Sequence, residues 1–145
     1  MTPTRTKRRT KSIGKVIVKK FNKTKAKKNL DSLWSQSVRL RDGRCCKCGS
    51  VACLNAHHIF GRRHLATRWV IDNGITLCMP CHIFWAHRDP GTFMAWWIGR
   101  YGKEEFDRLS NMSQMIYQEK SIPWDTLAMT LNNYIISKSM TDGGR

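Results

Sequence analysis

Apolar residues recur at helical spacing near both ends of the chain. Residues 29–43 combine a polar start and the stop Gly43 with a stripe made of Leu30, Leu33, Trp34 and Val38. After a break at residues 89–91, an apolar segment covers residues 93–101, and two more helical stripes follow over residues 103–120 and 123–137. Such stripes usually face a core, although one of them could instead form a dimer face.

Between these segments the pattern is that of a β-hairpin. Residues 51–60 are β-prone and contain two adjacent histidines, and residues 61–64 form a loop by composition. The chain then returns through residues 68–77 to a second strand, around the turn Asp72-Asn73-Gly74. A helix with His82 at its first position is expected after Cys81. The expected class is α+β, with a small ββα core flanked by helices.

The length of 145 residues and the 41% share of apolar residues fit one domain with tails. We expect a basic flexible tail over residues 1–28, a core over 29–90, a helical region over 91–138 and a short tail over 139–145. No apolar run reaches the roughly 20 residues of a membrane span, and the cationic start lacks the apolar block of a secretory signal. A cytoplasmic protein without membrane contact is therefore expected.

The charge is strongly positive and unevenly distributed. Lys and Arg number 26 against 10 Asp and Glu, which gives a net charge of +16, and residues 1–30 hold twelve basic residues and no acidic one. This balance predicts a polyanionic partner, with DNA favoured over a membrane surface or a merely solubilising tail because no clear amphipathic helix is present. The tail residues expected to contact nucleic acid are Lys7, Arg8, Arg9, Lys19 and Lys20.

Four of the six cysteines have the spacing of a metal site. Cys45 and Cys48 form one C-x-x-C, and Cys78 and Cys81 form a second, with turn residues beside each pair. Four thiolates at this spacing can close a tetrahedron around a structural Zn²⁺, whereas four unconnected buried cysteines are the plainer alternative. Cys46 and Cys53 are expected to be packed thiols.

The residues within this zinc frame resemble a known family. His57-His58, Asn73 ahead of Leu77-Cys78, and Cys81-His82 together look like the HNH endonucleases over about residues 30–90. Residues 30–49 and the basic N-terminus more loosely resemble the phage NinG or Rap recombination endonucleases. The resemblance implies a ββα-metal fold that cuts phosphodiester bonds, in the cytoplasm of a phage-infected bacterium. It also implies possible partners among phage recombination or packaging proteins.

The resemblance implies roles for the polar residues of the hairpin. His57 takes the position of a catalytic metal ligand and His58 that of the general base. His82, fixed beside a zinc-binding cysteine, is expected to be the second ligand of Mg²⁺ or Mn²⁺. Asn73 is expected to hold the loop that carries His58, although a plain Asn-Gly turn would also explain it.

The remaining candidates concern phosphate. His87 lies five positions after His82, which on an α-helix places the two side chains about 140° apart, so His87 is expected to contact phosphate rather than metal. Arg62 and Arg63 could clamp a phosphate or be solvated, and the sequence does not rank the two. The function expected is a phage-encoded, metal-dependent DNA endonuclease. The sequence leaves open whether it cuts branched recombination intermediates, for which a C-terminal apolar stripe could be the wedge that opens the DNA, or acts in DNA packaging. A non-catalytic zinc-knuckle nucleic-acid-binding protein is the alternative, and a toxin-type nuclease would use the same motif.

Overall fold

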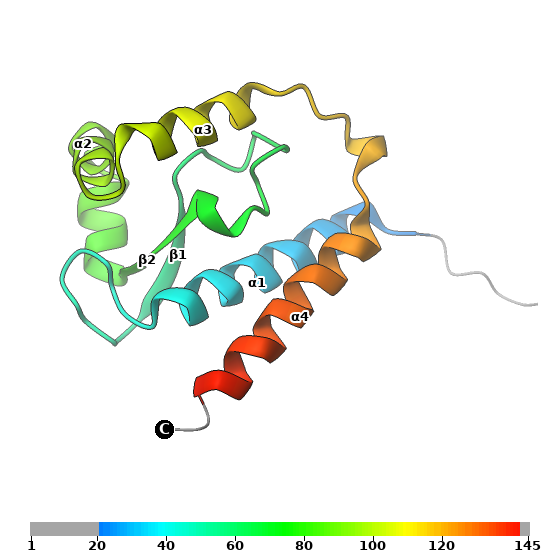
Figure 1. The fold of residues 1–145 in the computed structure, drawn as a ribbon, viewed down its shortest axis with the longest axis horizontal. Helices are drawn as coiled ribbons and strands as arrows, with labels where there is room; N and C mark the ends of the chain where they lie inside the picture. The colour runs from blue at the N-terminus through cyan, green and yellow to red at the C-terminus, as the bar shows by residue number, and fades with distance from the viewer. Residues whose placement is uncertain (1–20, 143–145) are drawn as a thin grey trace, which may run out of the picture.

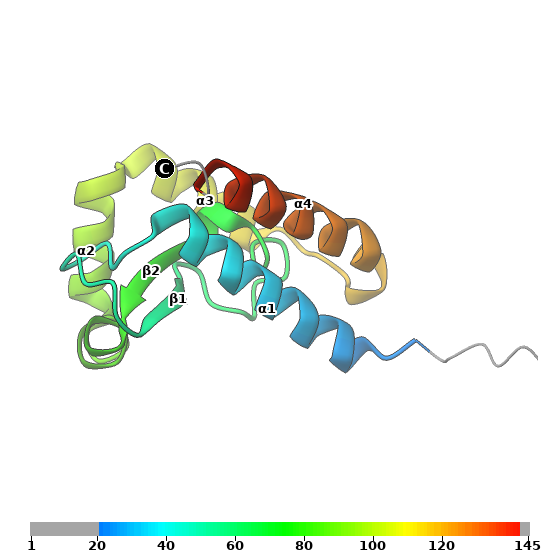
Figure 2. The same cartoon turned by 90° about the horizontal axis from the view of Figure 1, so that it is seen from below.

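Two helices from opposite ends of the chain lie side by side in the computed structural model, which describes residues 21–142 (Figures 1 and 2). They are α1 (Lys23–Asp42) and α4 (Trp124–Asp142). Between them in sequence come β1 (Leu54–His58), the 3₁₀ turn η1 (Ile71–Asn73), β2 (Gly74–Cys78), the π-helical turn η2 (Cys81–Ala86), α2 (Pro90–Tyr101), α3 (Lys103–Gln114) and the 3₁₀ turn η3 (Glu119–Ser121). The described part of the chain therefore has the predicted α+β class, with helices around a two-stranded sheet.

α1 begins at Lys23, earlier than the predicted start at residue 29. The side chain of Asn22 accepts a hydrogen bond from the Lys25 N–H at 2.9 Å and so caps the helix, a role typical of Asn. Gly43 ends the helix in the left-handed region at φ 67°, as expected for a glycine C-cap. Residues 23–28, which the sequence assigned to the tail, thus belong to α1.

The hairpin is antiparallel, with a register that runs from Leu54 opposite Cys78 to His58 opposite Gly74. α1 crosses one face of it and approaches very closely at Gly74. A Cβ on Gly74 would lie 2.7 Å from Trp34 Cζ2 and 2.5 Å from Val38 Cγ2, so only glycine fits there. Successive side chains of a strand alternate between faces, and Ile75 consequently points to the other side of the sheet.

Two apolar clusters result from this arrangement. One joins β2 to α2 and α3 through Ile75, Leu77, Phe93, Trp97 and Leu109. The other joins α1, the segment before η1 and α4 through Leu30, Trp34, Val38, Trp69, Ile122 and Leu131. The hairpin lies between the two clusters, and each cluster buries one of its faces.

The helix boundaries differ from the predicted ones at the C-terminal side. α3 ends at Gln114 and not near residue 120, because Met115 is extended and the side chains of Met115 and Ile116 remain 64% and 95% exposed. α4 continues to Asp142, which includes most of the predicted tail of residues 139–145. The predicted contacts of Lys7, Arg8, Arg9, Lys19 and Lys20, and a possible edge strand at residues 16–18, lie outside the described residues. None of the described helices is long and apolar enough to cross a membrane.

Candidate metal centres and histidine cavity

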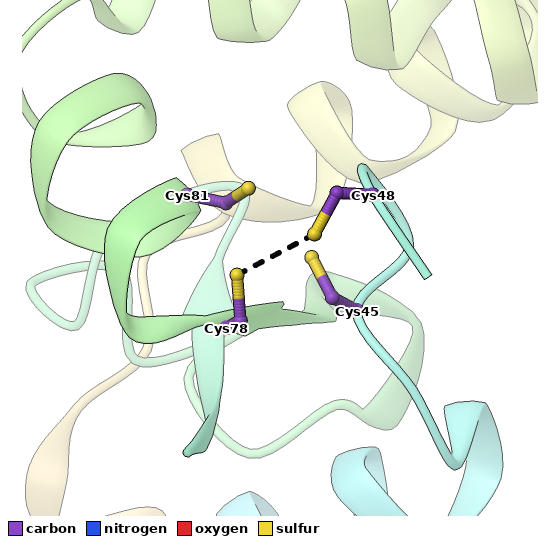
Figure 3. Close-up of side chains that lie close together, drawn as sticks. All are labelled: Cys45, Cys48, Cys78 and Cys81. Carbon is purple, nitrogen blue, oxygen red and sulfur yellow. Dashed lines mark hydrogen bonds between the residues drawn. The ribbon is translucent and has the colours of Figure 1, made fainter. Parts of the chain in front are cut away.

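The four cysteines of the two C-x-x-C pairs converge, as Figure 3 shows. The sulfur atoms of Cys45, Cys48, Cys78 and Cys81 all lie within 4.8 Å of one another, and those of Cys48 and Cys78 are 3.6 Å apart. Thiolates at about 2.3 Å from a tetrahedral Zn²⁺ are separated by about 3.8 Å. The cluster therefore has the composition and the spacing to hold a metal ion such as zinc.

Local backbone geometry brings each pair to the cluster. The Cys45 N–H donates to the Ser50 carbonyl at 2.7 Å, the Gly49 N–H donates to the Cys45 carbonyl at 2.8 Å, and Gly49 has φ 79°. This tight turn needs a residue that tolerates a positive φ. Cys78 ends β2 and Cys81 begins η2, with Pro80 between them. The second pair is thus held at the junction of a strand and a helical turn.

The environments of the cysteines shift the thiol pKa values of Cys45 and Cys81 in opposite directions. Burial raises the pKa of Cys45, but backbone N–H groups directed at its sulfur outweigh burial and lower the pKa to about 7. Burial and the neighbouring thiols raise the pKa of Cys81. Only a bound cation allows four adjacent thiols to lose their protons together, which couples metal binding to proton release. Cys46 and Cys53 lie outside the cluster, as predicted. Cys46 is half-buried, whereas Cys53 is exposed, so the prediction of a packed thiol was wrong for Cys53.

A second group of metal-binding side chains is formed by three histidines. Nitrogen atoms of His57, His82 and His87 all lie within 4.8 Å of one another. The Nε2 atoms of His82 and His87 are 3.2 Å apart, and the His57 ring lies edge-on to both, with centroids 5.1 Å and 4.9 Å away. Two nitrogens at 2.0–2.1 Å from one ion would be separated by about 2.9–3.4 Å. The three imidazoles thus have the spacing of a ligand set.

The inclusion of His87 contradicts the angular argument made from the sequence. That argument assumed an α-helix, whereas residues 81–86 form a π-helical turn in which the His87 N–H donates to the His82 carbonyl at 3.1 Å. The wider turn brings a residue back to the same side after five positions. His82 and His87 therefore face the same space, and the predicted separation of about 140° was wrong.

Burial favours the neutral form of His57 and His82. It lowers the pKa of His57 to about 3, with a further contribution from positive charge on His82, His87 and His58, and it also lowers the pKa of His82. A neutral imidazole offers the nitrogen lone pair that a metal ion requires. Phe93 also packs against His57, edge-on and with ring centroids 4.8 Å apart. These histidines open into a cavity of about 350 Å³ that is also lined by Ala56, His58, Gly61 and Arg62.

His58 lies in this cavity with a fixed ring. Its Nε2 is 2.9 Å from the Arg68 carbonyl oxygen, which can only accept, so Nε2 carries the proton and Nδ1 keeps a lone pair. The ring stacks on Trp34 at a centroid distance of 3.6 Å and an interplanar angle of 12°. Burial lowers the pKa of His58 to about 4. The hydrogen bond to the Arg68 carbonyl acts in the opposite direction, and the positive charge of Arg62 lowers the pKa further. The imidazole is therefore neutral and oriented at neutral pH.

Asn73 holds the loop that follows His58 and is fully buried. Its Oδ1 accepts from the Phe60 N–H at 2.8 Å, and its Nδ2 donates to the carbonyls of Phe60 and Thr67 at 2.8 Å and 3.0 Å. All of its hydrogen-bonding groups face backbone, and it does not line the cavity. These side-chain hydrogen bonds to Phe60 and Thr67 fix the loop, and a plain Asn-Gly turn would not need them.

The structure separates the two arginines that the sequence left unranked. Arg62 lines the histidine cavity, whereas the Arg63 Nε donates to His64 Nε2 at 3.0 Å on the exposed side of the loop. Arg68 is bound to the carboxylate of Asp31, at 3.0 Å and 2.7 Å. Arg62 is therefore the arginine placed to meet a ligand in the cavity.

Trp34, Phe93 and Asp31 were not recognised from the sequence as neighbours of the site. Trp34 and Phe93 occupy apolar stripes that equally fit any core, and no sequence spacing links them to His58 or His57.

No known protein family, curated protein or solved structure gives a significant match to the chain.

Proposed function

We propose that this chain is a metal-dependent DNA endonuclease of the HNH type, which hydrolyses phosphodiester bonds with His58 as general base. The observation that carries the proposal is the juxtaposition of His57, His82 and His87 with His58 and Arg62 in one cavity. Metal-assisted hydrolysis of a phosphodiester uses a metal ion, a base for the attacking water and a cation that binds the phosphate. The three histidines offer ligands for the metal ion, His58 offers the base and Arg62 offers the cation.

The three imidazoles would hold the catalytic ion and leave positions open for water and phosphate, as catalytic metal sites do. Such an ion would stabilise the charge that builds on the phosphate during cleavage. Nitrogen ligands favour transition metals such as Zn²⁺ or Ni²⁺ over Mg²⁺, which prefers oxygen ligands. We therefore expect a transition-metal ion, Mn²⁺ included, to activate the site better than Mg²⁺ does. The cysteine cluster would hold a separate, structural Zn²⁺.

His58 would take the proton of the attacking water at Nδ1. The Arg68 carbonyl fixes the tautomer in which this nitrogen has a lone pair, and the Trp34 ring holds the imidazole plane. The proton would then sit on a ring whose Nε2–H already points to a carbonyl oxygen. Arg62 would bind a non-bridging phosphate oxygen, because guanidinium groups form strong charge-assisted hydrogen bonds with phosphate.

DNA is the proposed substrate because the chain carries a net charge of +16 and a phosphate backbone is the polyanion that such a charge most often meets. Branched recombination intermediates and DNA undergoing packaging are the substrates that the sequence resemblance suggests. Cleavage of a panel of linear duplex, nicked, flapped and four-way DNA identifies which structure is preferred.

A cleavage assay with chelation and metal replacement tests the proposal. Removal of the exchangeable ion should abolish nicking of a supercoiled plasmid, and added Mn²⁺, Ni²⁺ or Zn²⁺ should restore it. Arg62→Ala should lower the rate of cleavage, and its neighbour Arg63→Ala, outside the cavity, is the matched control. A chain that binds DNA but never cuts it with any of these ions would favour the alternative of a non-catalytic zinc-knuckle protein.

A further inference from the structure

α4 has two apolar faces, and only one of them is covered within the described residues. Trp124, Leu127 and Leu131 pack toward α1 and the segment before η1. On the opposite side of the helix Met129, Ile136 and Met140 are 64%, 57% and 76% exposed. Three large apolar side chains on one exposed helix face are unusual for a surface that meets only water.

These exposed residues follow the spacing of a helix-pairing seam. We define the outer seam as Thr126, Met129, Asn133, Ile136 and Met140, all of them exposed. Their separations of three, four, three and four residues are those of the inner positions of a coiled coil. A polar Asn at one inner position is also typical, because it fixes the register at some cost in stability. The outer seam therefore has the pattern of a surface that packs against another helix.

The charge distribution identifies the kind of partner. Among the exposed residues of α4 whose burial the structure describes, Asp125 alone is charged, and the cation of the helix, Lys138, is half-buried and lies over the Tyr134 ring at 5.9 Å. By contrast α1, α2 and α3 expose Lys23, Arg100 and Lys103 respectively. Nucleic acid would find no cation on the outer seam. Two copies of a chain with a net charge of +16 repel each other, and the outer seam is where they can approach with the least repulsion.

We propose that the chain self-associates through the outer seam, which packs against the same seam of a second copy across a two-fold axis. In such a contact each copy presents the same surface, and the apolar side chains of one α4 cover those of the other. α1 lies between α4 and the hairpin formed by β1 and β2 (Figure 1). A second copy on the far side of α4 would therefore lie away from β1, which carries His57 and His58. The proposal does not depend on the nuclease function.

Sedimentation of the full chain tests the proposal. We expect a mass of 33.8 kDa, twice the 16.9 kDa of one chain. Association should strengthen when salt is raised, since salt screens repulsion between the copies and leaves the apolar contact intact. An interface built on surface ion pairs would weaken instead, and that result would overturn the proposal.

A matched pair of variants locates the contact. Ile136→Lys places a charge in the outer seam and should return the mass to 16.9 kDa. Asn132→Lys adds the same charge at an exposed position beside the seam and should leave the dimer intact. Met129→Lys is a second disruption in the same seam, and unchanged far-UV circular dichroism shows that each variant folds. A monomeric wild type at every concentration, or an Ile136→Lys and Met129→Lys chain that still dimerises, would contradict the proposal.

Discussion

The Nε2 atoms of His82 and His87 lie 3.2 Å apart, although the two residues are five positions apart in the chain. The backbone between them makes a π-helical turn, closed by the hydrogen bond from the His87 N–H to the His82 carbonyl. π-Helical turns are rare and are often found at functional sites. In this chain the turn has a specific consequence, because it adds a third imidazole to the two that the sequence motif predicts.

The first prediction is that His87 contributes to metal binding as strongly as His82 does. His87→Ala and His82→Ala should each weaken binding of a transition-metal ion by about tenfold to a hundredfold or more, since even outer partners of metal ligands contribute this much. Calorimetric titration of Ni²⁺ into the zinc-loaded chain measures the effect. His64→Ala removes an imidazole outside the cavity and is the control. Equal affinity for the wild type and His87→Ala would remove His87 from the ligand set.

The second prediction concerns the cysteine cluster. Cys45→Ser and Cys81→Ser should release about one equivalent of zinc and unfold the hairpin and η2, because structural zinc supplies about 10–16 kcal/mol in small zinc domains. Cys53→Ser, which changes an exposed cysteine outside the cluster, should keep both the metal and the melting temperature. Elemental analysis with thermal melting gives both readouts. A zinc-free wild type with the same melting curve as the loaded chain would contradict the prediction.

The third prediction tests the close approach of α1 to the hairpin. Gly74→Ala should destabilise the chain by about 1–3 kcal/mol, because the added methyl group would overlap Val38 and Trp34, as in other overpacked cores. Displacement of Trp34 would also disturb the ring on which His58 stacks. Gly99→Ala is the matched control, since a Cβ there meets nothing within 4 Å. Urea unfolding measures both variants, and equal stability of Gly74→Ala and the wild type would show that α1 can move away.

The fourth prediction concerns the dependence of stability on pH. Burial raises the pKa of Asp31, but hydrogen bonds from Arg68 and Trp69 outweigh burial and hold the pKa below its ordinary value of 3.8. A carboxyl with a lowered pKa in the folded state stabilises that state above its ordinary pKa and loses this effect as the pH falls through the lowered value. Asp31→Asn should therefore be less stable than the wild type at neutral pH.

The difference in unfolding free energy between these two chains should shrink toward zero as the pH falls through the lowered pKa of Asp31. Both are compared with the same metal content, so that acid release of metal affects them equally. A difference that is constant from neutral to acidic pH would mean that the Asp31 charge does not stabilise the fold.

The sequence was sufficient for the parts of the site that depend on local spacing. The two C-x-x-C pairs predicted which four cysteines converge, because each pair is fixed by a turn of a few residues. The adjacent histidines were likewise assigned to a strand, where neighbouring side chains point to opposite faces. His57 consequently meets η2 and Phe93, while His58 meets Trp34 and the Arg68 carbonyl.

Other parts could not be predicted because they depend on contacts between distant segments or on a rare backbone form. Periodicity cannot distinguish a π-helical turn of six residues from an α-helix, and the position of His87 was therefore misjudged. The early start of α1 was missed because its first turn is rich in lysine and lacks apolar residues. The stacking of Trp34 on His58 joins residues 24 positions apart and leaves no mark in the local pattern.

We propose that His58 is the base of a DNA-cleaving site. Single-turnover cleavage by the metal-loaded chain at saturating DNA tests it most directly, with His58→Ala compared to the wild type at equal DNA affinity and metal content. We predict that the wild type cuts and that His58→Ala cuts about a hundredfold to ten-thousandfold more slowly, as expected for the loss of a general base. Cleavage by His58→Ala at the wild-type rate, or a metal-loaded wild type that binds DNA and does not cut it, would contradict the claim.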